Sequence, residues 1–133
     1  MTINVRVLAG GNQSGFAEID HTNPFSLIAA ASTNATLVKG STGQIFSIHA
    51  VNQNAAMRYI KFYDTNTIPT AGIGTPVRRY AIPASTTGLG FVLTPKLPMG
   101  FNNGIAFTIT GGQADSDTTA LTAGDVTLTI EYN

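Results

Sequence analysis

Three aspartates near the end of the chain have the residue type and the spacing to do chemistry. Asp115 and Asp117 flank Ser116 in a segment that follows Gly111-Gly112, and Asp125 comes just before a run of alternating apolar residues. Carboxylate and hydroxyl oxygens grouped in this way can bind calcium. The spacing and the terminal glutamate of an EF-hand loop are absent, however, and Asp and Ser commonly build turns by bonding their own backbone. The sequence therefore favours turns here, with a calcium site as the alternative.

Other side chains that commonly act in catalysis are scarce. The chain has no cysteine, which excludes thiolate metal sites and a thiol nucleophile. Its two histidines are His21 and His49, and neither has the spacing of a paired metal-ligand motif. Asp20 precedes His21, but no Gly-x-Ser-x-Gly nucleophile elbow accompanies them. His49 falls in an apolar run, where we expect a hydrogen-bonded structural histidine. We therefore predict a protein that is not an enzyme and that binds no cofactor.

Charge is low and balanced, which argues against binding to nucleic acid. Lys and Arg number seven, Asp and Glu number seven, and charged residues make up 11% of the chain. DNA-binding proteins neutralise phosphates with clustered basic residues, whereas the one adjacent basic pair here is Arg78-Arg79. No segment approaches the roughly 18 apolar residues of a membrane span, and the start, MTINVRVLAGG, lacks a signal-peptide pattern. We expect synthesis in the cytoplasm and no membrane partner.

Aromatic and basic residues offer two candidate contact sites. Tyr and Arg are enriched at protein interfaces, so Arg78, Arg79 and Tyr80 form a candidate interface patch. The same residues could instead lie on a solvent-exposed edge strand, where their charges would prevent pairing with another chain. Sugar-binding sandwiches use exposed aromatic platforms, and since the chain has no tryptophan the candidates are tyrosines such as Tyr63 and Tyr80. A carbohydrate-binding module is therefore the alternative from a different functional class.

The elements that must position these residues are strands. Short β-branched and aromatic runs, separated by Gly, Pro, Asn and Thr, recur throughout, and apolar residues do not persist at helical spacing. Strict alternation in 105–110 and 125–132 places one side of each strand in a core. The expected core residues in these two strands are Ile105, Phe107, Ile109, Val126, Leu128 and Ile130. Between them, Ala106, Thr108 and Thr110 are expected on the outer face.

The middle of the chain supplies further strands. The segment 44–51 is apolar in both registers, which predicts a central strand with Phe46 and Ile48 in the core. In 57–63 either face could point inward, since Ile60 and Phe62 lie on one side and Tyr59 and Tyr63 on the other; we expect Ile60 and Phe62 in the core. Strands at 3–8, 77–82 and 89–93 complete the set, and prolines lie at the ends of the last two.

Seven to eight short strands separated by turn residues predict an all-β fold. The pattern is typical of a single antiparallel β-sandwich with a jelly-roll-like arrangement, which we expect to span 1–133 as one domain. No repeat, charge block or linker divides the chain. The stretch 10–34 lacks a regular pattern, so residues 1–34 are predicted to form an irregular amino-terminal arm.

Several motifs resemble a known group of proteins. The stretch Met57-Arg-Tyr-Ile-Lys-Phe-Tyr-Asp-Thr65, followed by Thr75-Pro76 and Ile82-Pro83-Ala84, resembles small structural proteins of tailed bacteriophages. Downstream, Gly104-Ile-Ala-Phe-Thr-Ile-Thr-Gly111 and Ala114-Asp-Ser-Asp-Thr-Thr119 are similar to the carboxy-terminal half of the same group. The resemblance covers residues 44–133. Because these are strand and turn motifs, they carry no site residue over to this chain.

The resemblance implies a virion component. Within the group, such a protein acts as a capsid decoration or cement protein that binds the major capsid protein on the outer surface of the phage head, often as a homotrimer. A module of the phage tail or of the host-recognition apparatus is the alternative that the resemblance leaves open.

Overall fold

The computed structural model describes residues 3–5, 17–19, 22–88 and 90–133, all of them in strands, turns or irregular segments. None of these residues belongs to a helix that is long and apolar enough to cross a membrane. The strands are β1 (Ile3–Val5), β2 (Ala17–Ile19), β3 (Asn23–Ile28), β4 (Thr36–Lys39), β5 (Gly43–Asn52), β6 (Arg58–Asp64), β7 (Arg78–Ile82), β8 (Phe91–Leu93), β9 (Met99–Phe101), β10 (Ile105–Thr110) and β11 (Val126–Tyr132).

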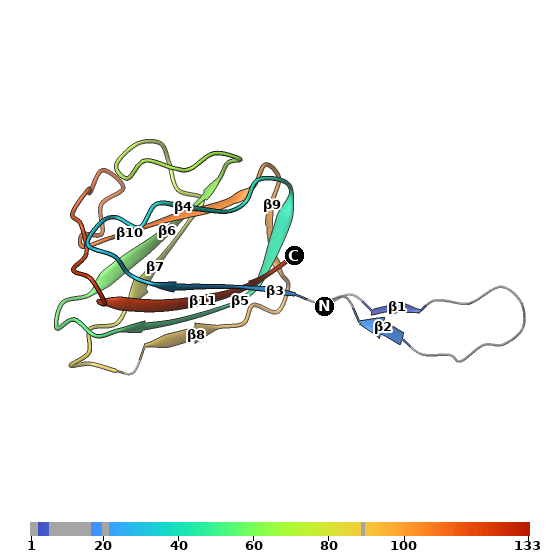
Figure 1. Ribbon diagram of the computed structural model, residues 1–133, viewed down its shortest axis with the longest axis horizontal. Helices are drawn as coiled ribbons and strands as arrows, with labels where there is room; N and C mark the ends of the chain where they lie inside the picture. The colour runs from blue at the N-terminus through green and yellow to red at the C-terminus, as the bar shows by residue number, and fades with distance from the viewer. Residues whose placement is uncertain (1–2, 6–16, 20–21, 89) are drawn as a thin grey trace, which may run out of the picture.

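Two antiparallel sheets pack face to face (Figure 1). One, here called the β6 sheet, has the order β4-β10-β6-β7, and the other, the β5 sheet, has the order β3-β11-β5-β8, with β9 also paired to β5. The hydrogen-bonded pairs are nested, since β3 pairs with β11, β4 with β10, β5 with β8 and β6 with β7. A long antiparallel hairpin rolled up on itself produces this nesting, which is the jelly-roll arrangement. The predicted β-sandwich is confirmed.

The core lies between the two sheets and contains the residues that alternation predicted. Ile105, Phe107, Ile109, Val126, Leu128, Ile130, Ile48, Ile60 and Phe62 are all fully buried. Phe62 is the centre of an aromatic cluster, because its ring contacts those of Tyr80, Phe101 and Phe107 at centroid distances of 6.1 to 6.2 Å. Rings at these distances and steep interplanar angles are in the favourable edge-to-face range.

Phe46 corrects one core prediction. Tyr132 of β11 pairs with Ile45, whereas Glu131 pairs with Ser47, so Phe46 is an extra residue in β5 at a β-bulge. A bulge changes the face on which the following residues of the strand lie. Ile45 is therefore fully buried, while Phe46 is half-exposed and faces away from the core.

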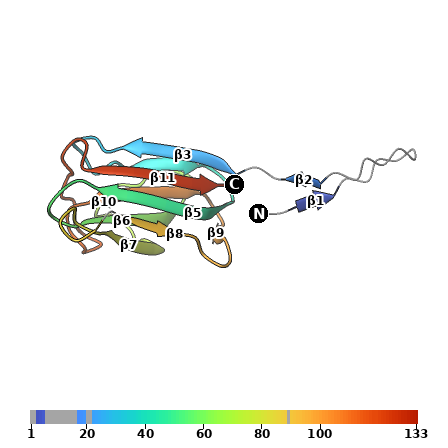
Figure 2. The ribbon, with the colours of Figure 1, turned by 90° about the horizontal axis from the view of Figure 1, so that it is seen from below.

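The first strands stand apart from the sandwich. β1 and β2 pair only with each other, and both views place them beyond one end of the two sheets (Figures 1 and 2). β3, in contrast, pairs with β11 along its whole length, and Asn34 is buried with its side chain bonded to Ala30. The predicted arm of residues 1–34 is thus shortened, because 23–34 belong to the sandwich. Of the remaining arm, the structure describes β1, β2 and Thr22. The other residues before Asn23, including 6–8 of the predicted first strand, lie outside the described residues.

Candidate functional site

The structure does not bring the three candidate calcium ligands together. Asp115 accepts hydrogen bonds from Arg79 in an exposed ion pair, while Asp117 accepts from the amides of Gly112 and Thr119. Asp125 lies elsewhere, at the start of β11. Among the described residues no group of three or more His, Cys, Asp or Glu side chains is placed to hold a metal ion. Asp117 instead closes its own loop, as the turn interpretation predicts.

Asp125 is the centre of a polar network at one end of the sandwich. Its carboxylate accepts hydrogen bonds from Arg58 Nε at 3.0 Å and Nη2 at 2.8 Å, from Asn54 Nδ2 at 3.1 Å and from the Thr122 amide at 3.0 Å. Burial by itself raises the pKa of Asp125, but these hydrogen bonds outweigh it and hold the pKa below its ordinary value of 3.8. The network joins the turn before β6 to the loop before β11, which is a structural role.

Arg78, Arg79 and Tyr80 do not form one patch, because adjacent residues of β7 point to opposite sides. Arg78 places its guanidinium 5.3 Å from the ring centroid of Phe101, and the Tyr80 hydroxyl contacts Met99 Sδ at 3.2 Å. Arg79 points the other way and pairs with Asp115. The candidate interface is therefore divided between the core side and the outer side of the β6 sheet.

The remaining candidates also differ from expectation. His49 is exposed on the outer face of the β5 sheet and is not the buried structural histidine that its apolar neighbours predict. His21 and Asp20 lie outside the described residues. Tyr63 is buried, and Tyr80 packs against the rings of Phe62 and Phe91. Tyr63 is thus not an exposed aromatic platform, and Tyr80 is half-buried.

The outer face of the β6 sheet is covered by two loops of the chain itself. Ala106, Thr108 and Thr110 lie on this face as predicted, yet all three are buried. The cover consists of the β6–β7 loop (65–77) and the β10–β11 loop (111–125), which touch each other at Gly72. A Cβ at Gly72, whose φ is +81°, would lie 2.7 Å from the Thr118 side chain. The contact thus leaves no room for a larger residue.

Lys61 is buried beneath this cover, with 1% of its surface exposed. Its ammonium donates hydrogen bonds to Thr110 Oγ1 at 2.9 Å, to the Gly112 carbonyl at 3.2 Å and to the Ala114 carbonyl at 2.5 Å. All three ammonium protons therefore have acceptors. Burial lowers the pKa of Lys61, although nearby carboxylates act in the opposite direction. The side chain fastens the β10–β11 loop to the sheet.

Two hydroxyls under the cover, those of Tyr63 and Thr108, are buried without a hydrogen-bond partner. Tyr63→Phe and Thr108→Val are each expected to raise the free energy of unfolding by about 1 kcal/mol, because each removes an unpaired polar group and keeps the shape of the side chain. Urea denaturation measures the change, with Thr127→Val on the exposed face of β11 as the neutral control. A loss of stability in either buried variant would show that its hydroxyl is hydrogen-bonded in solution.

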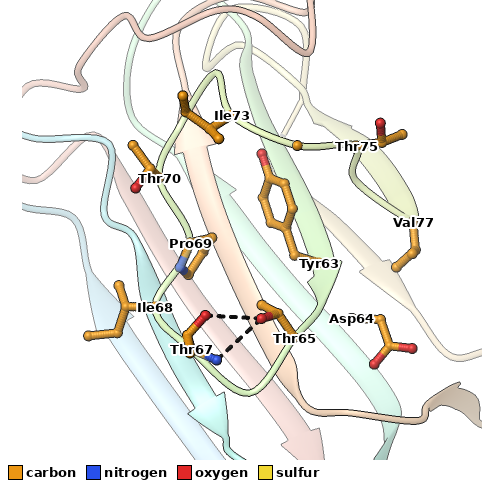
Figure 3. Close-up of a pocket in the computed structure, with 11 residues that line it drawn as sticks. Tyr63, Asp64, Thr65, Thr67, Ile68, Pro69, Thr70, Ile73, Thr75 and Val77 are labelled. Carbon is orange, nitrogen blue, oxygen red and sulfur yellow. Dashed lines mark hydrogen bonds between the residues drawn. The ribbon is translucent and has the colours of Figure 1, made fainter.

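A pocket opens beside Tyr63. It has a volume of about 360 Å³, its wall is the β6–β7 loop, and Tyr63 and Asp64 lie at its base. In Figure 3 the Tyr63 ring stands in the middle of the loop, with Thr70 and Ile73 on one side and Thr75 and Val77 on the other. The loop residues 65–77 include no charged side chain.

Within the part of the chain that the structure describes, no loop covers the outer face of the β5 sheet. The cross-strand register places ten residues on this surface, none of them buried; we call it the open face: Pro24, Ser26, Ile28, Ser47, His49, Val51, Val92, Thr127, Thr129 and Glu131. Among these ten residues Glu131 is the one acidic residue, His49 is the one histidine, and none is lysine or arginine. The open face is thus a broad sheet surface rich in hydroxyls and aliphatic groups and poor in charge.

Comparisons with known proteins add no further identification. The chain matched no protein family, no curated protein and no solved structure. The resemblance to tailed-phage structural proteins therefore stays a prediction that rests on the residues quoted above. The function has to be inferred from the surfaces that the fold presents, because the carboxylates with the spacing for chemistry are already engaged by protein donors.

A second pocket lies next to the open face, at the bulge of β5. It has a volume of about 380 Å³ and is lined by Phe46, by Pro95, Lys96 and Pro98 of the β8–β9 loop and by Glu131, among others. The hydroxyl of Thr22 donates to Glu131 Oε2 at 2.9 Å at its edge. Sequence reasoning missed this site, since alternation alone assigned Phe46 to the core; the bulge depends on pairing with β11.

Proposed function

We propose that this chain is a non-enzymatic structural protein of a virion, a decoration or cement protein that binds the outside of a phage head and stabilises the shell. Its main partner is the major capsid protein, and it acts as a homo-oligomer, with three copies as the expected number. The open face is the observation that carries the proposal. No loop of the described residues covers it, whereas the outer face of the β6 sheet lies under two loops.

The open face has the properties of a surface that meets another protein. Interface cores are depleted in charged residues, and the open face holds one carboxylate and one histidine among ten residues. Its exposed aliphatic residues include Ile28, of which 73% is exposed, and Val92. A decoration protein stabilises a shell by binding the assembled lattice and not its dissociated subunits, so many modest contacts become large in sum.

The direct test is co-sedimentation of the purified chain with expanded phage heads that lack it. We expect saturable binding at a fixed ratio to the major capsid protein, together with increased thermal resistance of the heads. Failure to bind, or binding without added resistance, would contradict a cement role and would favour a place in the tail.

A charged substitution on the open face tests which surface binds. Thr127→Glu is expected to weaken head binding at least about tenfold, because a carboxylate would be buried in the contact without a partner. Thr127 is exposed and points away from the core, so the sandwich should remain folded. The matched control is Thr86→Glu, in an exposed turn between β7 and β8. Equal binding by both variants would exclude the open face as the contact surface.

A carbohydrate-binding module of a tail or host-recognition apparatus is the second candidate. The pocket beside Phe46 favours it, because an aromatic ring lies there with a carboxylate and hydroxyl groups. Glycan-array binding that is abolished by Phe46→Ala and retained by Thr127→Glu would support this function over the first.

A further inference from the structure

The β6–β7 loop exposes an unusual amount of apolar surface around the pocket beside Tyr63. Ile68, Ile73 and Val77 are 65%, 68% and 49% exposed, and all three line the pocket. The remaining large exposed apolar residues of the described chain are Ile28, Met57, Val92 and Leu97. Concentrated exposed apolar surface marks contact sites on soluble proteins. The pocket rim therefore has the apolar character of a contact site.

Among the exposed apolar residues, Leu97 is the one that we consider able to enter such a pocket, because its side chain lies in an exposed loop. It lies in the β8–β9 loop, and its 77% exposure is the largest of the seven residues. Pro98 follows it directly and Pro95 precedes it by two positions, so the loop backbone is restricted before any contact forms. Ile28 and Val92 lie within strands of a flat sheet face, where a side chain cannot reach into a cavity.

Charge also matches between the two sites. Asp64 is the one charged residue that lines the pocket, and hydrogen bonds from the Asn103, Asn102 and Gly104 amides hold its pKa below 3.8, so it is ionised at neutral pH. Lys96, next to Leu97, is the one charged residue between Leu93 and Met99. A docked loop would place the ammonium of Lys96 near this carboxylate, which favours one orientation over others.

We propose that Leu97 of one molecule inserts into the β6–β7 pocket of a second copy of this chain. The two sites cannot meet within one molecule, because the yellow-green β6–β7 loop lies at the upper left of the sandwich in Figure 1 and the β8–β9 connection lies at its lower right. A contact between two different surfaces is heterologous, so it closes into a ring when the rotation allows and otherwise continues as a chain. Each molecule then donates one leucine and receives another.

Sedimentation velocity of the purified full chain over a concentration series tests this contact, and the test does not depend on binding to phage heads. We expect reversible self-association in the wild type. Leu97→Thr and Ile73→Thr should each lower the association constant about ten- to hundredfold, the range that corresponds to burying one leucine side chain. Ile28→Thr is the matched control, because it makes a similar change at an equally exposed residue outside the contact, and it should associate like the wild type.

Mixing the two deficient variants identifies the pairing. The Leu97→Thr chain keeps an intact pocket and the Ile73→Thr chain keeps an intact leucine, so the mixture should form a one-to-one heterodimer and no larger species. A wild type that stays monomeric at all concentrations would overturn the proposal. The proposal would fail equally if Leu97→Thr associated as tightly as the wild type, or if the mixture gave no heterodimer.

Discussion

Replacing Phe62 with alanine is expected to lower the free energy of unfolding by about 4 kcal/mol. Phe62 is fully buried at the centre of β6, and its ring contacts three other aromatic rings, those of Tyr80, Phe101 and Phe107. Removing a buried phenylalanine costs about 3 to 5 kcal/mol through lost burial and the cavity that is left. Since small domains are stable by about 5 to 15 kcal/mol, this change would remove a large part of the total. Equilibrium unfolding in urea gives the value.

Phe46→Ala is the matched control for this prediction. The two residues are chemically identical, but Phe46 lies at the bulge of β5 and is half-exposed. We expect Phe46→Ala to cost about 1 kcal/mol, because little packed volume is lost. Similar losses for both variants would mean that Phe46 packs in the core in solution and that the register of β5 differs from the one described above.

Removing the carboxylate of Asp125 is expected to destabilise the protein by about 3 to 5 kcal/mol. Asp125→Ala would leave the guanidinium of Arg58, which is 12% exposed, without its anionic partner. It would also leave the Thr122 amide and the Asn54 side chain without an acceptor. Because the network joins two loops at one end of the sandwich, hydrogen exchange of 122–126 should become faster in the variant. An unfolding free energy close to that of the wild type would contradict the structural role.

Asp115→Ala is the control for Asp125→Ala. It removes an exposed ion pair and so shows whether the loss of any ion pair is equally destabilising. Asp115 and Arg79 are both solvent-exposed, so their hydrogen bonds compete with water and are screened by salt. We expect little change in stability from this variant. If it matched Asp125→Ala, burial would not be the reason for the importance of Asp125.

The Asp125 network also predicts how stability depends on pH. Hydrogen bonds from the folded protein hold the pKa of Asp125 below 3.8, despite the opposing effect of burial. The carboxylate therefore contributes its full stability above the unfolded pKa of 3.8, and the contribution is lost as the pH falls through the lower folded pKa. Asp64 and Asp117 act in the same direction. The wild type should thus lose stability in acid, and Asp125→Ala should lose less between neutral and acid pH.

The outer faces of the two sheets differ in whether loops cover them. This difference affects both the stability of the fold and the surfaces that we propose for contacts. On the β6 sheet, two loops bury Lys61, Tyr63 and Thr108, which are polar residues that a bare sheet would expose. One of these loops then presents the apolar rim of the pocket beside Tyr63. On the β5 sheet no loop of the described residues covers the strands, and the open face is the surface that we propose for a partner. The two proposals thus use different surfaces, because the proposed self-association uses a loop over the β6 sheet and the proposed shell binding uses the open face.

The sequence by itself determined the class of the fold and most of its core. Alternation of apolar residues is a local pattern, because successive side chains of a strand point to opposite faces wherever the strand is placed. This pattern correctly assigned Val126, Leu128 and Ile130, and it also placed Phe107. It could not locate the bulge at Phe46, since a bulge exists only relative to the partner strand, here β11.

Only the tertiary structure decided what surrounds each candidate functional residue. Sequence proximity grouped Asp115, Asp117 and Asp125, but the fold gives each a separate set of hydrogen-bond donors. Alternation placed Thr108 on an outer face, and the burial of that face depends on loops from distant parts of the chain. The 77% exposure of Leu97 likewise depends on how the rest of the chain packs around its loop. Local periodicity specifies which way a side chain points, whereas its environment depends on contacts between segments that are remote in sequence.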